Sequence, residues 1–137
     1  MPIRAMSHVT IYVLDQEAAK SFYVDQLGFE VREDATLDGF RWLTVGPTSQ
    51  PDLELILIEP NPPMFDQETA DQMRAMIAKG ALGTGVFATD DCKGTVEELK
   101  GSGVTILQEP AERPYGIEAV IRDDSGNWFS LTQRTTP

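Results

Sequence analysis

The sequence has few of the residues that usually carry strong chemical signatures. It contains one cysteine, Cys92, and one histidine, His8, in 137 residues. A single cysteine excludes an internal disulfide and makes a reducing cytosol the default expectation. No apolar run approaches the roughly 18 residues of a membrane-spanning helix, and the N-terminal stretch lacks the apolar region of an export signal. We therefore expect a soluble cytoplasmic protein with no membrane segment.

Basic residues are also scarce. Lys and Arg number 11 against 22 Asp and Glu, so the formal net charge is −11. Nucleic acids and anionic membrane surfaces both attract clustered Lys and Arg, so we expect neither as a partner. The remaining composition, 41% hydrophobic and 24% charged, is that of an ordinary globular protein. Its length fits one domain or two very small modules that share a core.

Hydrophobic patterning predicts the same order of elements twice. Alternation and turn signals predict strands in the first half at residues 8–13, 29–34, 40–45 and 53–59, and in the second half at residues 86–89, 104–107, 117–122 and 128–132. Helical spacing predicts one helix from the cap Asp15 to Gly28 and another from Asp90 or Asp91 to Gly101. A linker helix is expected at about 66–79. Both halves therefore read β-α-β-β-β, and an offset of 76 residues superposes His8 on Thr84 and Glu54 on Ser130.

Five segments in this order resemble a known family. They are His8-Val9-Thr10-Ile11-Tyr12-Val13, Ala19-Lys20-Ser21-Phe22-Tyr23, Leu27-Gly28-Phe29, Leu53-Glu54-Leu55 and Asp123-Asp124-Ser125-Gly126-Asn127-Trp128-Phe129. With them the chain resembles the vicinal oxygen chelate superfamily, which includes glyoxalase I, bleomycin-resistance proteins, epimerases and extradiol dioxygenases. The resemblance implies an α+β fold in which two βαβββ modules, related by a pseudo-twofold repeat, form a curved mixed sheet around a cavity. It also implies a homodimer. The expected single domain spans 1–137, with module one at about 5–60, the linker at 61–82 and module two at 83–134.

The resemblance also implies four metal-ligand positions. They fall on His8, Glu54, Thr84 and Ser130 in the register above. Imidazole and carboxylate are ordinary ligands for divalent transition metals, whereas neutral hydroxyls are poor ones. We therefore expect no cofactor or a weakly held divalent metal, which disfavours glyoxalase I and dioxygenase activity.

His8 and Glu54 stand out from the residue pattern alone. Glu54 places a carboxylate on a strand face that it shares with Ile56 and Ile58, so it points into a wet cavity or into a core that must satisfy it. The alternative is structural: His8 is then a hydrogen-bonding residue near a rim, and Glu54 is paired with an arginine.

Further candidates follow from residue type. Glu54 and Glu118 are candidate proton-transfer residues, although alternation does not fix which face Glu118 occupies. Cys92, in the first turn of a helix, is a candidate nucleophile or simply a small residue at a helix start. The candidates for the ligand pocket are aromatic or cationic: Tyr12, Trp42, Tyr115, Trp128 and Arg122. Core packing and surface ion pairs are the common alternatives for such residues.

The sequence is compatible with three functions. The favoured one is binding of a small, partly apolar or aromatic organic molecule without a complete metal site. The second is a divalent-metal lyase, isomerase or epimerase with His8 and Glu54 as ligands, in which Glu54 or Glu118 moves a proton. The third is a structural dimer with a vestigial cavity.

Overall fold

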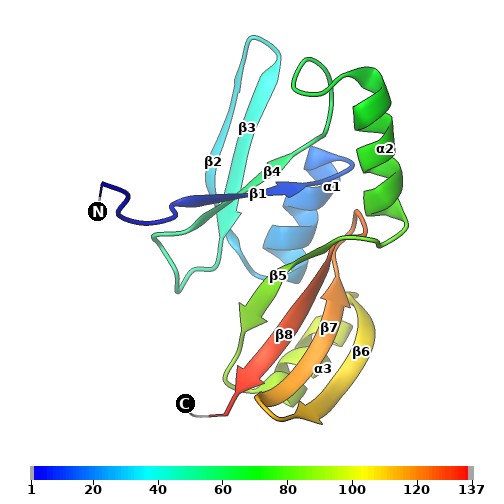
Figure 1. Cartoon of the computed structure of the whole chain (residues 1–137). Helices are drawn as coiled ribbons and strands as arrows, with labels where there is room; N and C mark the ends of the chain where they lie inside the picture. The colour runs from blue at the N-terminus through cyan, green and yellow to red at the C-terminus, as the bar shows by residue number, and fades with distance from the viewer. Residues whose placement is uncertain (1, 136–137) are drawn as a thin grey trace. The chain divides into compact units, whose positions relative to one another are not determined.

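The computed structural model describes residues 2–135 and divides into two compact units, one ending at Arg74 and the other beginning at Ala75. Each unit carries one four-stranded mixed sheet (Figure 1). The prediction of two βαβββ modules in an α+β fold is confirmed.

The first unit has the sheet order β1-β4-β3-β2. Its strands are β1 (His8–Tyr12), β2 (Glu30–Leu37), β3 (Phe40–Gly46) and β4 (Glu54–Ile58). β1 runs parallel to β4, and the other pairs are antiparallel. The predicted Asp38-Gly39 turn joins β2 to β3 with both residues at positive φ, 53° and 79°. Asparagine, aspartate and glycine tolerate this left-handed conformation best.

The helix of the first unit begins where the sequence predicts. The Asp15 carboxylate accepts a 2.9 Å hydrogen bond from the Ala18 amide and caps α1 (Gln16–Ser21). The chain then continues as a π-helical segment, η1 (Phe22–Gln26), before Gly28 ends it at φ 77°. The alternation of the sheet buries Ile11, Leu43 and Leu57 on one face. The opposite face carries polar and aromatic side chains together with Ile56 and Ile58.

The second unit repeats the arrangement with the sheet order β5-β8-β7-β6. Its elements are β5 (Gly83–Ala88), α3 (Cys92–Gly101), β6 (Thr105–Arg113), β7 (Gly116–Arg122) and β8 (Trp128–Arg134). Cys92 and Val96 of α3 form a buried cluster with Ala119 and Leu131, so this face of the sheet is the core face.

All four strands of the second unit are longer than predicted. β6 continues through Pro110 to Arg113, and β5 starts at Gly83 instead of Val86. Proline is tolerated in β6 because this strand lies at the edge of its sheet and one side of it donates no ladder hydrogen bonds.

Helix α2 (Gln67–Ala78) lies in the predicted linker. The Asp66 carboxylate accepts a 2.7 Å hydrogen bond from the Thr69 amide at its start. None of the described helices is long and apolar enough to cross a bilayer.

Candidate functional site

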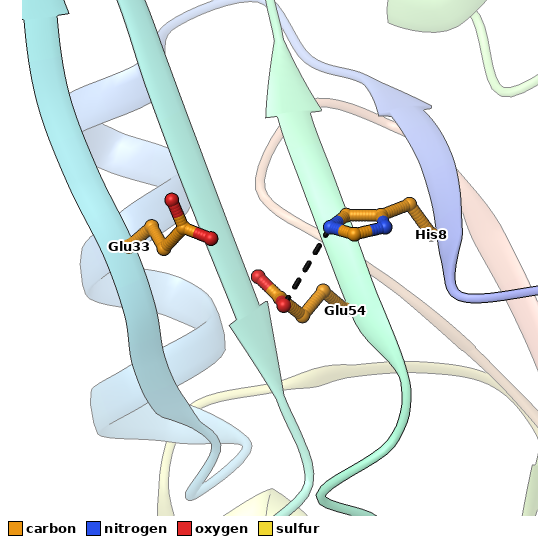
Figure 2. Close-up of side chains that lie close together, drawn as sticks. All are labelled: His8, Glu33 and Glu54. Carbon is orange, nitrogen blue, oxygen red and sulfur yellow. Dashed lines mark ion pairs between the residues drawn. The ribbon is translucent and has the colours of Figure 1, made fainter.

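His8 and Glu54 meet on the sheet face of the first unit that the apolar core leaves free. They are paired residues of the parallel strands β1 and β4, and Nε2 of His8 lies 3.5 Å from Oε2 of Glu54 (Figure 2). The other carboxylate oxygen, Oε1, accepts a 2.6 Å hydrogen bond from Thr44 Oγ1 on β3. Both oxygens of Glu54 therefore have partners, and among residues 2–135 these are His8 and Thr44 instead of the arginine of the structural alternative.

Glu33 of β2 points toward the same pair (Figure 2). One ligand atom from each of His8, Glu33 and Glu54 lies within 4.8 Å of the others. A β-bulge between Val31 and Glu33 directs Glu33 to this face. Two carboxylates beside one imidazole repel each other, and a cation at this point would offset that repulsion.

The His8 ring is held on its other side. Ser7 Oγ lies 2.8 Å from Nδ1, and the Trp42 ring lies 5.9 Å from the imidazole, centroid to centroid, at an interplanar angle of 48°. If Nδ1–H donates to Ser7, Nε2 keeps a lone pair for a metal ion; if Ser7 donates, Nε2–H faces Glu54. The imidazole and indole together offer an aromatic surface beside a polar pair.

The second unit has a separate acid-centred cluster. Ser130 Oγ donates to Glu118 Oε2 at 2.5 Å, and Tyr115 Oη donates to Glu118 Oε1 at 2.6 Å. The Ser130 and Tyr115 hydrogen bonds, aided by Arg113, lower the pKa of Glu118, and the carboxylate in turn raises the pKa of Tyr115. Glu118 is thus held as an ionised acceptor, which weakens it as a base at neutral pH.

The burial of its neighbour shows which face of the sheet Glu118 occupies, a point that the sequence pattern does not determine. Its neighbour Ala119 belongs to the buried cluster, so Glu118 lies on the opposite face with Ser130 and Thr132. Ser130 and Thr132 share a 2.7 Å hydrogen bond. Three of the predicted site residues, Tyr115, Glu118 and Ser130, are therefore brought together.

The two metal positions expected in the second unit do not repeat the first. Ser130 pairs with Val86 across the parallel β5–β8 ladder, in the way that Glu54 pairs with His8. The ladder is irregular between Gly83 and Gly85, so Thr84 lies two residues before the partner of Ser130. Neither valine nor a neutral hydroxyl is a strong metal ligand.

The remaining predicted pocket residues make local contacts. The Tyr12 ring packs edge-on against the Phe65 ring, with 5.6 Å between the ring centroids. Arg122 Nε donates a 3.4 Å hydrogen bond to the Asp123 carbonyl. The Trp128 indole lies over Gly83, where a Cβ atom would collide with it. Trp128 and Arg122 are a cross-strand pair on the face that carries Glu118 and Ser130.

Cys92 is a structural residue. Its side chain is fully buried, Sγ lies 3.5 Å from the Leu131 carbonyl oxygen, and burial raises the pKa of the thiol. The helix start therefore does not create a reactive thiolate here, because burial disfavours the charged form of the thiol.

Sequence reasoning did not find Glu33 and Thr44. Thr44 alternates with Trp42 in a predicted strand, so the alternation predicts that both side chains lie on the same face. The face of Glu33 is not predictable in this way, because the bulge at Arg32 breaks the alternation.

Comparison with known proteins assigns the family. The sequence model of the glyoxalase/bleomycin resistance protein/dioxygenase superfamily matches residues 5–131. The protein YurT of Bacillus subtilis (strain 168) is 34% identical over 126 residues, which cover 91% of this chain and 95% of YurT.

Two solved structures are similar along nearly the whole chain. The crystal structure of UcmS2 is 54% identical with a TM-score of 0.92 and covers 96% of this chain and 99% of UcmS2. TnmS3, an antibiotic binding protein from Streptomyces sp. CB03234, is 30% identical with a TM-score of 0.78 and covers 98% of this chain and 99% of TnmS3. The chain belongs to the glyoxalase/bleomycin resistance protein/dioxygenase superfamily, the vicinal oxygen chelate proteins.

Proposed function

We propose that this protein binds a small, partly aromatic organic molecule and does so without a complete four-ligand metal site. The observation that carries the proposal is the His8–Trp42 ring pair beside Glu54 and Thr44. The side chains of His8 and Glu54 keep 34% and 23% of their surface exposed, so a ligand can reach them. Apolar walls with a few fixed polar groups are typical of small-molecule sites.

The comparisons support this reading. TnmS3, which shares 30% of its sequence with this chain, is an antibiotic binding protein. Binding alone requires no proton-transfer group, which agrees with a Glu118 whose pKa is lowered by its hydroxyl donors. We expect sequestration of an intact ligand by a cytoplasmic homodimer.

Titration calorimetry with three fused-ring probes tests the proposal: 2-naphthol, quinoline and naphthalene-2-sulfonate. We expect at least one to bind, and Trp42→Ala to weaken it about tenfold through loss of the ring contact. Trp128→Phe, which changes the other tryptophan, is the matched control. Binding by none of the probes, or equal binding by Trp42→Ala, would contradict the proposal.

A second candidate rests on Glu33. Together, His8, Glu33 and Glu54 offer one imidazole nitrogen and two carboxylates as metal ligands. This ligand set suits Mn²⁺, Fe²⁺, Ni²⁺ or Zn²⁺. Three protein ligands are the usual number in catalytic zinc sites. Such an ion would polarise a substrate carbonyl for a lyase, isomerase or epimerase. Thr44 and Ser7 would orient Glu54 and His8 as outer-shell partners.

Electron paramagnetic resonance of added Mn²⁺ tests the second candidate. We expect Glu33→Gln to weaken binding at least about tenfold if Glu33 is a ligand. Asp52→Asn, an exposed change two residues before Glu54, is the control. No Mn²⁺ binding, or equal binding by Glu33→Gln, removes this candidate and leaves the first untouched.

A further inference from the structure

The sheet of the first unit opens into a fork at one end. β3 and β4 pair only at Thr44–Ile56 and Val45–Leu55, although β3 extends back to Phe40 and β4 onward to Ile58. Beyond these pairs β4 stays with β1, through Tyr12–Ile58, while β3 stays with β2, through Leu37–Phe40. The two halves of the sheet therefore separate at this end.

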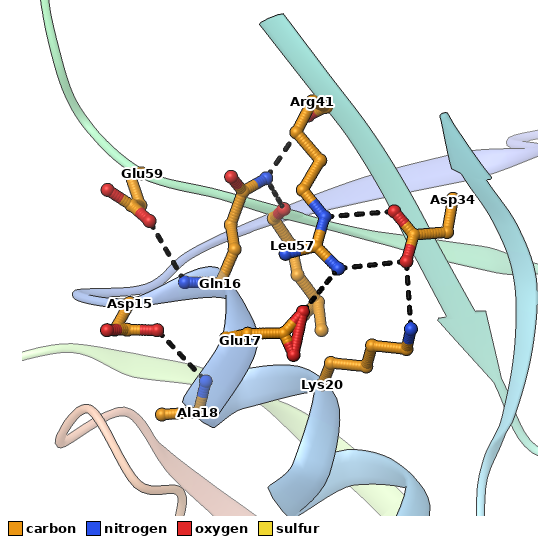
Figure 3. A network of polar contacts seen from close by, with 9 residues as sticks. All are labelled: Asp15, Gln16, Glu17, Ala18, Lys20, Asp34, Arg41, Leu57 and Glu59. Carbon is orange, nitrogen blue, oxygen red and sulfur yellow. Dashed lines mark hydrogen bonds and ion pairs between the residues drawn. The ribbon is translucent and has the colours of Figure 1, made fainter. Parts of the chain in front are cut away.

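Gln16 fills the base of the fork. Its side-chain Nε2 donates to the Arg41 carbonyl at 3.1 Å and to the Leu57 carbonyl at 2.8 Å, so one amide bridges the strands that have parted (Figure 3). Its Oε1 takes part in none of the hydrogen bonds found among residues 2–135. It remains available as an acceptor.

A pocket of about 300 Å³ lies in this fork. One wall is the β2–β3 hairpin with Asp38 and Phe40, and the other is the end of β4 with Ile58 and the loop to Met64. Phe40 and Met64 are 46% and 47% exposed, so a ligand can contact both side chains without displacing the wall. The residues of the His8–Glu54 pair do not line the pocket.

The walls are held in place before any ligand arrives. Arg41 is fixed by Asp34 and Glu17, and Asp34 also binds Lys20 at 2.9 Å (Figure 3). On the other wall, Arg74 donates to the Leu14 carbonyl, Glu59 and Asn61. A preformed pocket of this kind binds without a large ordering cost.

The charges at the pocket select against anions. Asp38 and Glu59 contribute two carboxylates. Glu59 pairs with Arg74, and the one lining guanidinium, Arg41, pairs with Asp34 and Glu17, so the net negative charge at the pocket comes from Asp38. The acceptors on offer are Gln16 Oε1 and the Asp38 carboxylate. A matching ligand presents an aromatic ring to Phe40, Ile58 and Met64 and an N–H donor to these oxygens.

We propose that the β3–β4 fork is a second binding site, separate from the His8–Trp42 face, for a small neutral or cationic aromatic compound that carries an N–H donor. The proposal does not depend on the proposed function, because the two sites share no lining residue named above. Its failure and that of the proposed function are therefore separately observable.

The test is a ¹H–¹⁵N NMR titration with three probes that share a ring: indole, tryptamine and indole-3-acetate. We expect indole and tryptamine to shift the Gln16 side-chain amide and the backbone amides of Gly39 and Asn61. We expect indole-3-acetate to bind at least about fivefold more weakly, because of its charge. Shifts confined to the surroundings of His8 and Trp42, or tighter binding of the anion, would overturn the proposal.

Matched variants complete the test. Phe40→Ala is expected to lower the affinity for tryptamine about tenfold, and Leu37→Ala is expected to leave that affinity unchanged. Leu37 is 76% exposed on the same hairpin and does not line the pocket. Because Phe40 is exposed, its variant should retain the native amide spectrum, and equal affinity in a folded Phe40→Ala protein would refute the site.

Discussion

His8 and Glu54 occupy paired positions on neighbouring parallel strands, which brings Nε2 within 3.5 Å of Oε2. In the second unit the corresponding pair is Val86 and Ser130, which has no acid or imidazole. The acid of that unit, Glu118, comes from β7 instead. The two modules therefore share their strand pairing but not the chemistry placed on it.

The Ser130–Glu118 hydrogen bond should make stability depend on pH. We expect Ser130→Ala to cost about 1.5–3 kcal/mol at pH 7, since the hydrogen bond is to a charged acceptor. Glu118 has a pKa lowered from 4.5, so the stability from its ionised form is fully present above that value. It is lost as pH falls through the lower folded value, and the cost of Ser130→Ala should shrink accordingly.

Urea unfolding at pH 7 and near pH 3 measures this difference. The control is the same serine change in a Glu118→Gln background, where the pH dependence should vanish. A cost of Ser130→Ala that is the same at both pH values would mean that Glu118 is not stabilised in its ionised form.

Replacement of Gln16 should destabilise the first unit. In Gln16→Ala the Arg41 and Leu57 carbonyls lose their shared donor, at an expected cost of about 1–3 kcal/mol. Gln67→Ala, which removes an exposed hydrogen bond to Asp71, is the control and should stay within about 0.5 kcal/mol of the parent protein. Chemical denaturation compares the two, and equal costs would argue against the bridging role.

A methyl group at Gly83 should disturb Trp128. The Cβ atom of Gly83→Ala would collide with the Trp128 indole, so the ring must move, at an expected cost of about 1–3 kcal/mol. The control is Gly101→Ala at the end of α3, where the added Cβ atom has no neighbour within 4 Å. We expect this change to be neutral or slightly stabilising. Thermal unfolding and tryptophan fluorescence report the two effects, and an unchanged emission spectrum in Gly83→Ala would contradict the packing.

Cys92 should be unreactive in the folded protein. Its buried thiol, whose pKa is raised by desolvation, should not react with Ellman's reagent in buffer and should react fully in urea. Rapid reaction of the native protein would show that the start of α3 opens to solvent.

The sequence alone determined the order of the elements and the family. Period-two alternation predicts the strands, and Asp15 and Asp91 each cap a helix by accepting a hydrogen bond from an amide three residues on. These signals are local, so one chain segment is enough to produce them. The sequence also isolated His8 and Glu54, whose pairing the structure places at 3.5 Å.

Tertiary structure decided which side chains meet. Bulges shift the faces of Glu33 in β2 and of Thr84 in β5, and the separation of β3 from β4 creates the fork that Gln16 bridges. The face of Glu118 is set by its neighbour Ala119, which packs into the core. Each of these facts depends on register between strands far apart in the chain, and a one-residue slip reverses every face, so no local pattern can supply them.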